Sequence, residues 1–437
     1  MVVHAHRSEA ILGPDLVPVS GVLRVDDSGV IRGIAPHPEP GDEIIDHPDC
    51  ALIPGGVNVH NHSFQALLRG LGDDLPFLEW RARGLYRYGA HLGPDEVYLG
   101  ALLAFAEMLR SGTTTVCDFF YVHADGLDND RAVLRAAKDL GIRCVLARTM
   151  YDWDGAPVSF RETIDDAVTR SQQLRSEIAD DPLLSLQPAP HSLHGASSPM
   201  IEAGVALAKD WHSPCHTHIA EESYQRQEAL DQWGIGPVEH LEHQGWLNER
   251  SVLVHAIWLE KNELDAIAKA GASIAHCPAS NMFLGDGVTP VNAYLNRGVT
   301  VGLGTDGGCT NSRHSVYDEA RSCSMLAKVD ACDGAALSAE TAFTLATIGG
   351  ADLLQLPTGR LEAGYQADFS VIRLDDLSMQ PVHNLAKNIV HSMTDRAIAE
   401  VYVAGRRVVA DGHVLHLDAH WLSLELKALA GRWRAAP

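Results

Sequence analysis

The fold of this chain is indicated first by one short segment, Gly55-Gly56-Val57-Asn58-Val59-His60-Asn61-His62. An apolar run, residues 51–54, leads into it and indicates a β-strand. Residues two apart in a strand point to the same face, so His60 and His62 direct two imidazoles towards one point. Two neutral imidazoles at one point suggest a metal site. Because His-x-His also occurs elsewhere in the chain, the other ligands have to come from distant segments.

Outward from this segment, residues 54–355 alternate short apolar runs with helical patterns. The predicted helices span residues 95–111, 128–140, 159–178, 198–209, 260–270, 288–297, 315–328 and 338–350. After the opening strand, the predicted strands lie at residues 114–120, 143–148, 183–187, 214–218, 251–255, 272–276 and 299–304. Eight strands alternating with helices predict an α/β fold of the (β/α)8 TIM-like barrel type, in which functional groups lie where strands end.

The two ends of the chain carry β-type patterns of their own. Residues 1–53 and 356–415 contain short strand patterns separated by turn residues, and we predict that they form one small β-sandwich domain beside the barrel. The His4/His6 pair in the first of these segments is expected to be solvated. Residues 416–437 contain a final amphipathic helix, at about 418–433.

Charge and composition exclude several classes of partner. The 437-residue chain has a formal net charge of −23 and lacks a Lys/Arg cluster, which argues against nucleic acid and anionic membranes as partners. No stretch of about twenty apolar residues occurs, and the start lacks a signal-peptide pattern, so we expect a cytoplasmic enzyme. The eight cysteines are scattered and are predicted to be reduced core thiols.

The residues at the predicted strand ends are of the types that bind metals and move protons. In chain order these ends carry His60 and His62, then His218 and Glu221, then His255, and finally Asp306. Imidazoles and a carboxylate form a suitable donor set for zinc or ferrous iron, with a further position left for water. Since these strand ends meet at one rim of a barrel, the sequence predicts a metal centre there.

Several motifs also carry a resemblance to a known family. Besides the opening segment, they are His216-Thr217-His218-Ile219-Ala220-Glu221, Val254-His255, His276-Cys277-Pro278, Gly302-Leu303-Gly304-Thr305-Asp306 and Gly359-Arg360-Leu361. In this order they resemble the amidohydrolase superfamily, and within it the mononuclear aminohydrolases that include guanine, S-adenosylhomocysteine and related heterocycle deaminases. The resemblance covers nearly the whole chain.

The resemblance implies a role for each of these residues. It implies metal ligation by His60, His62, His218 and Asp306, a proton shuttle at Glu221 and an acid/base or polarising group at His255. The chemistry agrees: a metal lowers the pKa of bound water, a carboxylate takes the proton, and the hydroxide attacks an electron-poor C–N carbon. The resemblance alone implies a homodimer.

The number of metals follows from the end of the fourth predicted strand. Binuclear members of the superfamily bridge their metals through a modified lysine there, whereas this chain reads Gln187-Pro188-Ala189-Pro190-His191. We therefore predict one divalent metal, zinc first and iron as the alternative. Strand parity allows His216 to be a ligand as well, but the family pattern favours His218, and His216 is interpreted as structural.

The residues behind the metal-binding segment are candidates for the substrate wall. They are Gln65, Trp80, Phe120, Tyr121, Arg148, Asp152 and His191. Gln65 suits hydrogen bonding to a ring amide, and Trp80 suits covering an aromatic face. Where the similar nucleoside deaminases hold ribose with a glutamate, this chain has Tyr88-Gly89-Ala90. The sequence leaves the functional roles of His194, His216 and Arg148 open.

The sequence thus predicts a small-molecule enzyme. We expect a metal-dependent hydrolytic deaminase of an amino-substituted N-heterocycle, such as a purine, pterin or pyrimidine-like ring, that releases ammonia. The alternatives are an iminohydrolase for formimino or guanidino compounds, a triazine-type hydrolase, or a barrel that only binds its ligand. Glu221 argues against the last alternative, because a binding protein has no need of a proton shuttle.

Overall fold

The His60/His62 segment forms strand β6 (Gly56–His62) in a computed structural model that describes residues 2–435. All of β6 is buried, and its side chains alternate between two faces. Val57 and Val59 join the main hydrophobic core, while His60 and His62 lie on the opposite face. Gly56 is required by close packing, because a Cβ there would lie 2.4 Å from Cγ1 of Val316.

The strands of the central body run parallel and follow one another in chain order. They are β6, β7 (Thr113–Phe120), β8 (Arg143–Met150), β9 (Leu184–Pro190), β10 (Cys215–Ile219), β11 (Ser251–His255), β12 (Ser273–His276), β13 (Val301–Leu303) and β14 (Asp306–Gly307). Hydrogen bonds join β6 to β9 and β10 to β13 as two sheets. A bridge between Ser192 and His218 links the two sheets, and β14 pairs with β6, so the order is that of the predicted (β/α)8 barrel.

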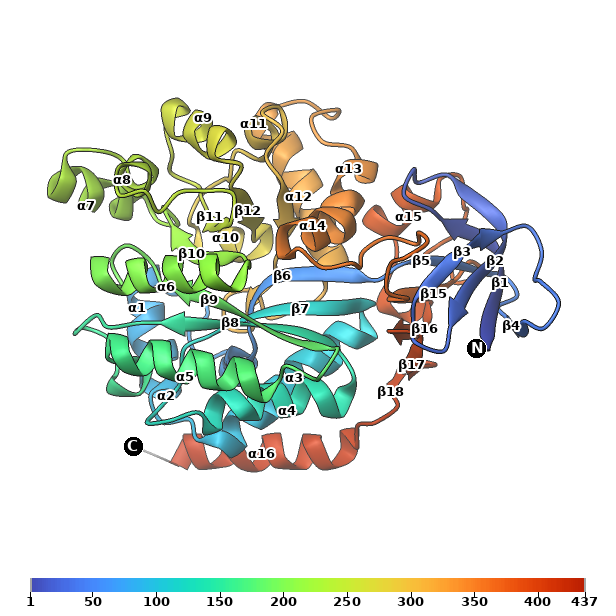
Figure 1. Cartoon of the computed structure of the whole chain (residues 1–437), viewed down its shortest axis with the longest axis horizontal. Coiled ribbons are helices and arrows are strands. Elements are labelled where there is room, and N and C mark those ends of the chain that lie inside the picture. The colour runs from blue at the N-terminus through green and yellow to red at the C-terminus, as the bar shows by residue number, and fades with distance from the viewer. Residues whose placement is uncertain (1, 436–437) are drawn as a thin grey trace.

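Helices surround these strands (Figure 1). They are α3 (Pro94–Arg110), α4 (Asp128–Leu140), α5 (Ile164–Glu177), α6 (Ser198–Trp211), α7 (Ser223–Trp233), α8 (Pro237–His243), α9 (Lys261–Ala270), α10 (Pro278–Leu284), α11 (Val291–Leu295), α12 (Val316–Ala331), α13 (Ala339–Thr344), α14 (Gly350–Leu354) and α15 (Leu385–His391), which contacts α12 and α13. The helix predicted from residue 159 starts later, at Ile164. The Thr163 hydroxyl accepts a hydrogen bond from the Asp166 amide and caps this helix.

Strands from both chain ends form one sheet, as the sequence predicts. Within the described residues this sheet has nine strands in the order β18-β17-β16-β15-β5-β1-β2-β3, with β4 beside β1. Their bounds are β1 (Val3–Leu12), β2 (Pro18–Asp26), β3 (Ile31–Ala35), β4 (Glu43–Asp46), β5 (Cys50–Pro54), β15 (Phe369–Arg373), β16 (Ile398–Val403), β17 (Arg406–Ala410) and β18 (His413–Val414). Strand β5 leads directly into β6, so this sheet is continuous along the chain with the first barrel strand.

The expectation that the first His-x-His pair is solvated is wrong for His6. This residue is buried, and its Nδ1 atom lies 3.0 Å from Nε2 of His47. The ring edges of Phe369 and Tyr402 also contact it, each with a centroid distance of 4.9 Å. The reason is that β1 is an inner strand of the sheet rather than a free end.

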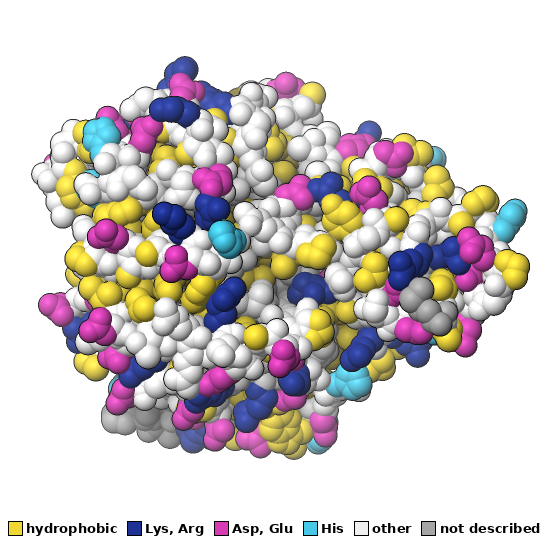
Figure 2. Space-filling view, in the orientation of Figure 1, with side chains coloured by type: hydrophobic (Ala, Val, Ile, Leu, Met, Phe, Trp, Pro, Cys, Tyr) yellow, Lys and Arg dark blue, Asp and Glu magenta, His cyan; other side chains and the backbone are white. Residues whose placement is uncertain are grey.

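The chain closes with helix α16 (Ala419–Ala435), which lies along α3. Among residues 2–435, no helix is both long and apolar enough to cross a membrane. Over the face shown in Figure 2, Lys and Arg side chains are interspersed with Asp and Glu.

Candidate active site

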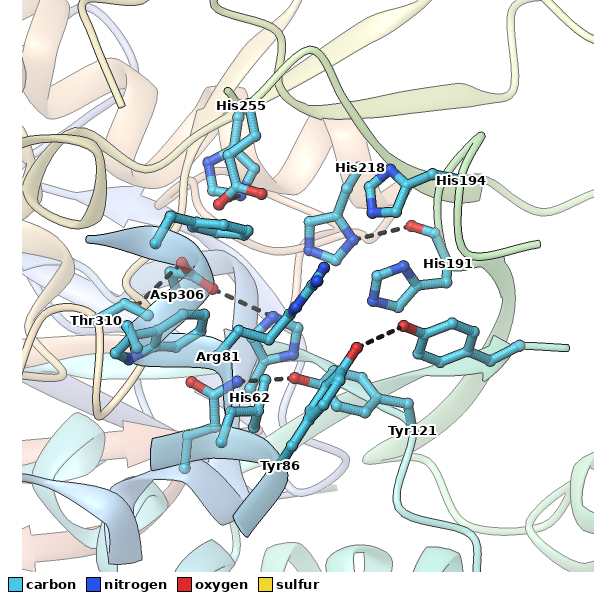
Figure 3. A pocket seen from close by; sticks show the side chains of 16 residues that line it. His62, Arg81, Tyr86, Tyr121, His191, His194, His218, His255, Asp306 and Thr310 are labelled. Atoms are coloured by element: carbon cyan, nitrogen blue, oxygen red, sulfur yellow. Dashed lines mark hydrogen bonds and ion pairs between the residues drawn. The ribbon is translucent and has the colours of Figure 1, made fainter. Parts of the chain in front are cut away.

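A cavity lies at the carboxyl ends of the barrel strands (Figure 3). It is lined by nine residues that the sequence predicts: His62, Gln65, Trp80, Tyr121, His191, His218, Glu221, His255 and Asp306. It is also lined by His194, whose role the sequence left open, and by residues that the sequence did not single out: Phe77, Arg81, Leu85, Tyr86, Tyr151 and Thr310. The wall therefore combines strand ends with the helical segment that follows β6.

Three imidazoles and a carboxylate meet at the bottom of this cavity. The Nε2 atoms of His60 and His218 are 3.2 Å apart. The Oδ1 atom of Asp306 lies 3.4 Å from Nε2 of His60 and 3.2 Å from Nε2 of His62. All four residues are buried. His60 and His62 lie on β6, His218 on β10 and Asp306 on β14, so the cluster joins three strands that are far apart in the sequence.

Neighbouring groups hold these donor atoms in place. The Nδ1–H groups of His62 and His218 donate to the carbonyl oxygens of Phe119 and His191, at 2.6 and 2.9 Å. Each ring therefore turns its Nε2 lone pair inwards. On Asp306, Oδ2 accepts hydrogen bonds from the Ser280 and Thr310 hydroxyls at 2.6 and 3.1 Å, which leaves Oδ1 facing the imidazoles.

The pKa shifts of three of these groups, His60, His218 and Asp306, are suited to holding a cation. Burial lowers the pKa of His60 to about 3 and that of His218 well below its ordinary value, so both are neutral at pH 7. Burial raises the pKa of Asp306, but hydrogen bonds and charge from His60 and His62 outweigh it and hold the pKa well below its ordinary value. For His62, burial lowers the pKa, and the contacts with Asp306 more than compensate and raise it.

This donor set fits a divalent metal. Zinc binds His nitrogen and carboxylate oxygen at roughly 2.0–2.1 Å, so tetrahedral ligand atoms lie about 3.4 Å apart. The donor separations of 3.2 to 3.4 Å in this cluster agree with that spacing. The residues present therefore form a His/Asp metal-binding site.

A second pair of groups lies beside this cluster. The Nε2 atom of His255 is 3.4 Å from Oε1 of Glu221. Asn281 fixes the imidazole: its Oδ1 accepts from Nδ1–H of His255 at 3.0 Å, and its Nδ2 donates to the Thr289 hydroxyl at 3.0 Å. Burial raises the pKa of Glu221 to about 7, against the lowering effect of nearby His255. This carboxyl group can therefore exchange a proton near neutral pH.

Strained backbone conformations also occur at this rim. Ala220, His255 and Asp306 have φ angles of 46°, 67° and 56°, in the left-handed region that non-glycine residues rarely adopt. Such conformations cost on the order of 1–3 kcal/mol each and persist only where the surrounding structure fixes them. Here they turn the chain sharply at the strand ends and direct the side chains into the cavity.

The predicted substrate wall is partly assembled. The Nε2 group of Gln65 donates to the Tyr121 hydroxyl at 2.8 Å, and its Oε1 accepts from Sγ of Cys309 at 3.1 Å. The indole N–H of Trp80 donates to the Cys309 carbonyl oxygen at 3.0 Å, so Cys309 joins the two wall residues. The His191 ring is stacked on Tyr151, with centroids 4.1 Å apart.

Arg148 does not line the cavity, contrary to the sequence prediction. Its side chain is fully buried, with Nη1 and Nη2 each 2.9 Å from Glu162 and Nε 3.0 Å from Asp130. A guanidinium held by two carboxylates is already neutralised in the core. Strand β8 turns this residue towards the surrounding helices rather than into the barrel.

Three further candidates also lie elsewhere. Asp152 accepts hydrogen bonds from the backbone and hydroxyl of Ser197 at 2.7 and 2.6 Å. Phe120 packs edge-on against Phe64 in the core. His216 places Nε2 2.6 Å from Oε1 of Gln187, one layer below the metal cluster, in the structural position that the sequence favoured.

The residues that the sequence missed come largely from the irregular segment after β6. Helix α1 (Phe77–Trp80), the π-helical turn η2 (Arg81–Tyr86) and helix α2 (Arg87–Gly89) supply Phe77, Arg81, Leu85 and Tyr86. The two-residue period of a strand does not predict side-chain directions in such a helical segment. The sequence offered only one signal for these residues, which is their position next to Trp80.

Comparison with known proteins agrees with this geometry. The sequence profile of the amidohydrolase family matches residues 51–408. The chain is 32% identical over 410 residues to the 5-methylthioadenosine/S-adenosylhomocysteine deaminase of Natronomonas pharaonis. This match covers 94% of this chain and 93% of that protein. An adenosine deaminase from Xanthomonas campestris with bound zinc superposes with a TM-score of 0.92 at 29% identity, covering 100% of this chain and 99% of that one.

A hydrolase of another type has the same architecture. The zinc complex of atrazine chlorohydrolase from Arthrobacter aurescens superposes with a TM-score of 0.90 at 25% identity, covering 98% of this chain and 100% of that one. The family profile spans most of the chain and includes the strands that carry the cluster. The chain therefore belongs to the amidohydrolase family and is an aminohydrolase that acts on C–N bonds.

Proposed function

We propose that this enzyme is a metal-dependent hydrolytic deaminase of an amino-substituted N-heterocycle, with an adenine-type ring as the first class to test. The observation that carries the proposal is the position of Glu221 and His255 beside the His/Asp cluster, 3.4 Å apart at one cavity wall. A base of this kind next to a metal site is what hydrolysis of a ring C–NH2 bond requires.

We assign the metal to His60, His62, His218 and Asp306. Zinc is favoured, because imidazoles with one carboxylate suit it and the similar adenosine deaminase was solved with zinc. One metal per chain is proposed, since the end of β9 carries Gln187 and no lysine. When bound, the metal supplies a water molecule whose pKa is lowered towards neutrality and whose oxygen is the nucleophile.

Glu221 moves the proton in this scheme. Its carboxylate takes a proton from the nucleophilic water and passes it, as a carboxylic acid, to the departing amino nitrogen, which leaves as ammonia. A pKa of about 7 allows both directions of transfer near neutral pH. His255 faces Glu221 through Nε2, because Asn281 occupies its Nδ1–H. It shares the proton and aligns the carboxyl group.

The relatives favour an adenine-type ring. The similar proteins are named as deaminases of methylthioadenosine, S-adenosylhomocysteine and adenosine. The chain has Tyr88-Gly89-Ala90, with no carboxylate, in the region where similar nucleoside deaminases hold ribose with a glutamate. The ring centroids of Tyr88 and Trp433 on α16 are 5.1 Å apart, and Tyr88 does not line the cavity. The proposal therefore includes free heterocycles along with nucleosides.

A triazine-type hydrolase is the second candidate. Its support is the structural likeness to zinc-bound atrazine chlorohydrolase. The same proton transfer at Glu221 would serve a ring carbon that loses a different leaving group. An iminohydrolase, a dimeric assembly and a cytoplasmic location stay predictions from the sequence.

Ammonia release decides between these activities. The zinc-loaded enzyme is assayed with adenine, adenosine, methylthioadenosine, aminopterins, cytosine, chloro- and aminotriazines, and formimino amino acids. Release of ammonia from an aminopurine, aminopterin or cytosine supports the proposal. Release of chloride from a chlorotriazine, with no ammonia from any aminoheterocycle, would favour the second candidate, and turnover of formimino compounds alone would contradict both.

A further inference from the structure

Arg81 is a cation in the cavity wall without an anionic partner in the described part of the chain. It lines the same cavity as His62, His218 and Glu221, and its side chain is half-buried. In Figure 3 it extends into the cavity towards the imidazoles of His218 and His191. None of the ion pairs and hydrogen bonds among residues 2–435 involves its guanidinium.

Other arginines withdrawn from solvent in this protein are neutralised. Arg143 pairs with Asp368 at 2.8 Å, and Arg148 pairs with Asp130 and Glu162. On the same helical segment as Arg81, the exposed Arg83 lies 3.4 Å from Glu79. A charge held off water costs free energy unless it is paired, so an unpaired guanidinium at a ligand cavity marks a place for an anion.

Aromatic rings hold Arg81 in this position. Its Cζ atom lies 5.4 Å from the ring centroids of both Tyr86 and Trp153. The Tyr86 hydroxyl is 3.3 Å from that of Tyr151, which ties η2 to the loop after β8. Stacking on aromatic faces leaves the guanidinium edge, with its N–H groups, free to donate.

We propose that Arg81 binds a carboxylate of the substrate and makes the enzyme selective for acidic members of its substrate class. This inference rests on the proposed function and narrows it. A guanidinium edge matches the two oxygens of a carboxylate, and such charge-assisted pairs are stronger than neutral hydrogen bonds. The carboxylate belongs either to the heterocycle or to a tail attached to it.

Two matched pairs of compounds distinguish these sources. Cytosine and 5-carboxycytosine differ by a carboxylate on the ring, while methylthioadenosine and S-adenosylhomocysteine differ by an amino-acid tail that carries one. Binding to the zinc-loaded enzyme is measured by calorimetry, which needs no turnover. In at least one pair, we expect the acidic member to bind roughly 10- to 100-fold more tightly than its partner. The pair that shows this preference identifies the source.

The variants separate charge recognition from structure. Arg81→Gln should remove most of this preference while changing the affinity of the neutral compounds by less than about threefold, and Arg81→Lys should retain part of it. Arg83→Gln is the matched control and should leave the preference unchanged. Thermal melting and zinc content show that each variant is folded and loaded.

Two outcomes would overturn the proposal. One is a native enzyme that binds neither acidic compound better than its neutral partner. The other is an Arg81→Gln variant that weakens acidic and neutral compounds equally. Binding and ammonia release are measured separately. If no ammonia is released, the proposed deaminase function fails but the binding preference can still be tested, and if the binding preference is absent, the deaminase function can still be tested.

Discussion

The Nε2 atom of His255 lies 3.4 Å from the Oε1 atom of Glu221, and both side chains are buried at the edge of the His/Asp cluster. Glu221 follows β10 and His255 ends β11, so adjacent parallel strands deliver the two groups to one side of the cavity. The contact couples a carboxyl group of raised pKa to an imidazole fixed by Asn281.

Glu221→Gln should bind zinc normally and lose most of its turnover. The amide keeps the size of the carboxyl group but cannot accept the proton, and positioned general bases contribute roughly 10²- to 10⁴-fold to the rate. Single-turnover rates and metal content are measured on the same preparation. An unchanged rate would remove Glu221 from the mechanism, and a loss of zinc would assign it to the metal site instead.

Turnover should fall on the acid side with a midpoint near pH 7. Glu221 accepts the proton in its ionised form, and burial raises its pKa to about 7. Lowering the pH through this value protonates it, so kcat at pH 6 should be roughly a tenth of the plateau reached at higher pH. A pH–rate profile of kcat checks this. A midpoint near the ordinary glutamate value would contradict the role assigned to its buried carboxylate.

His218→Asn should lose the metal, whereas His216→Asn should keep it. Both residues lie on β10 and point to the same face, but only His218 places Nε2 beside His60, at 3.2 Å. His216 contacts Gln187 instead. Metal analysis of the native protein should give about one zinc per chain. Two tightly bound metals, or retention of zinc by His218→Asn, would contradict the assignment.

Arg148→Met should destabilise the fold without changing substrate selectivity. The substitution leaves Asp130 and Glu162 buried without their shared cation, which costs on the order of 3–5 kcal/mol. Urea unfolding measures this loss. Arg131→Met, which removes an exposed pair with Glu177, is the control and should cost about 1 kcal/mol or less. A tenfold loss of kcat/KM at native stability would return Arg148 to the substrate wall.

Local patterns in the sequence predicted most of the elements. The helix predicted at residues 128–140 is α4, whose end is set by Gly141 with a φ of 74°. The helix predicted from residue 159 was wrong at its start, because Thr163 caps α5 and the preceding residues form a separate turn. The eighth strand was predicted as one continuous strand at residues 299–304. In the structure it is divided into β13 and β14, and Asp306 begins β14.

The sequence by itself determined which strand ends carry ligand-type residues. That information is local, since a strand places every second side chain on one face and the opening His60/His62 pair needs only this period. Only the tertiary structure decided which arginine faces the cavity. Arg148 is withdrawn because Asp130 and Glu162, from other elements, neutralise it in the core. Arg81 reaches the cavity from an irregular helical segment, where no short-range period specifies the direction of a side chain.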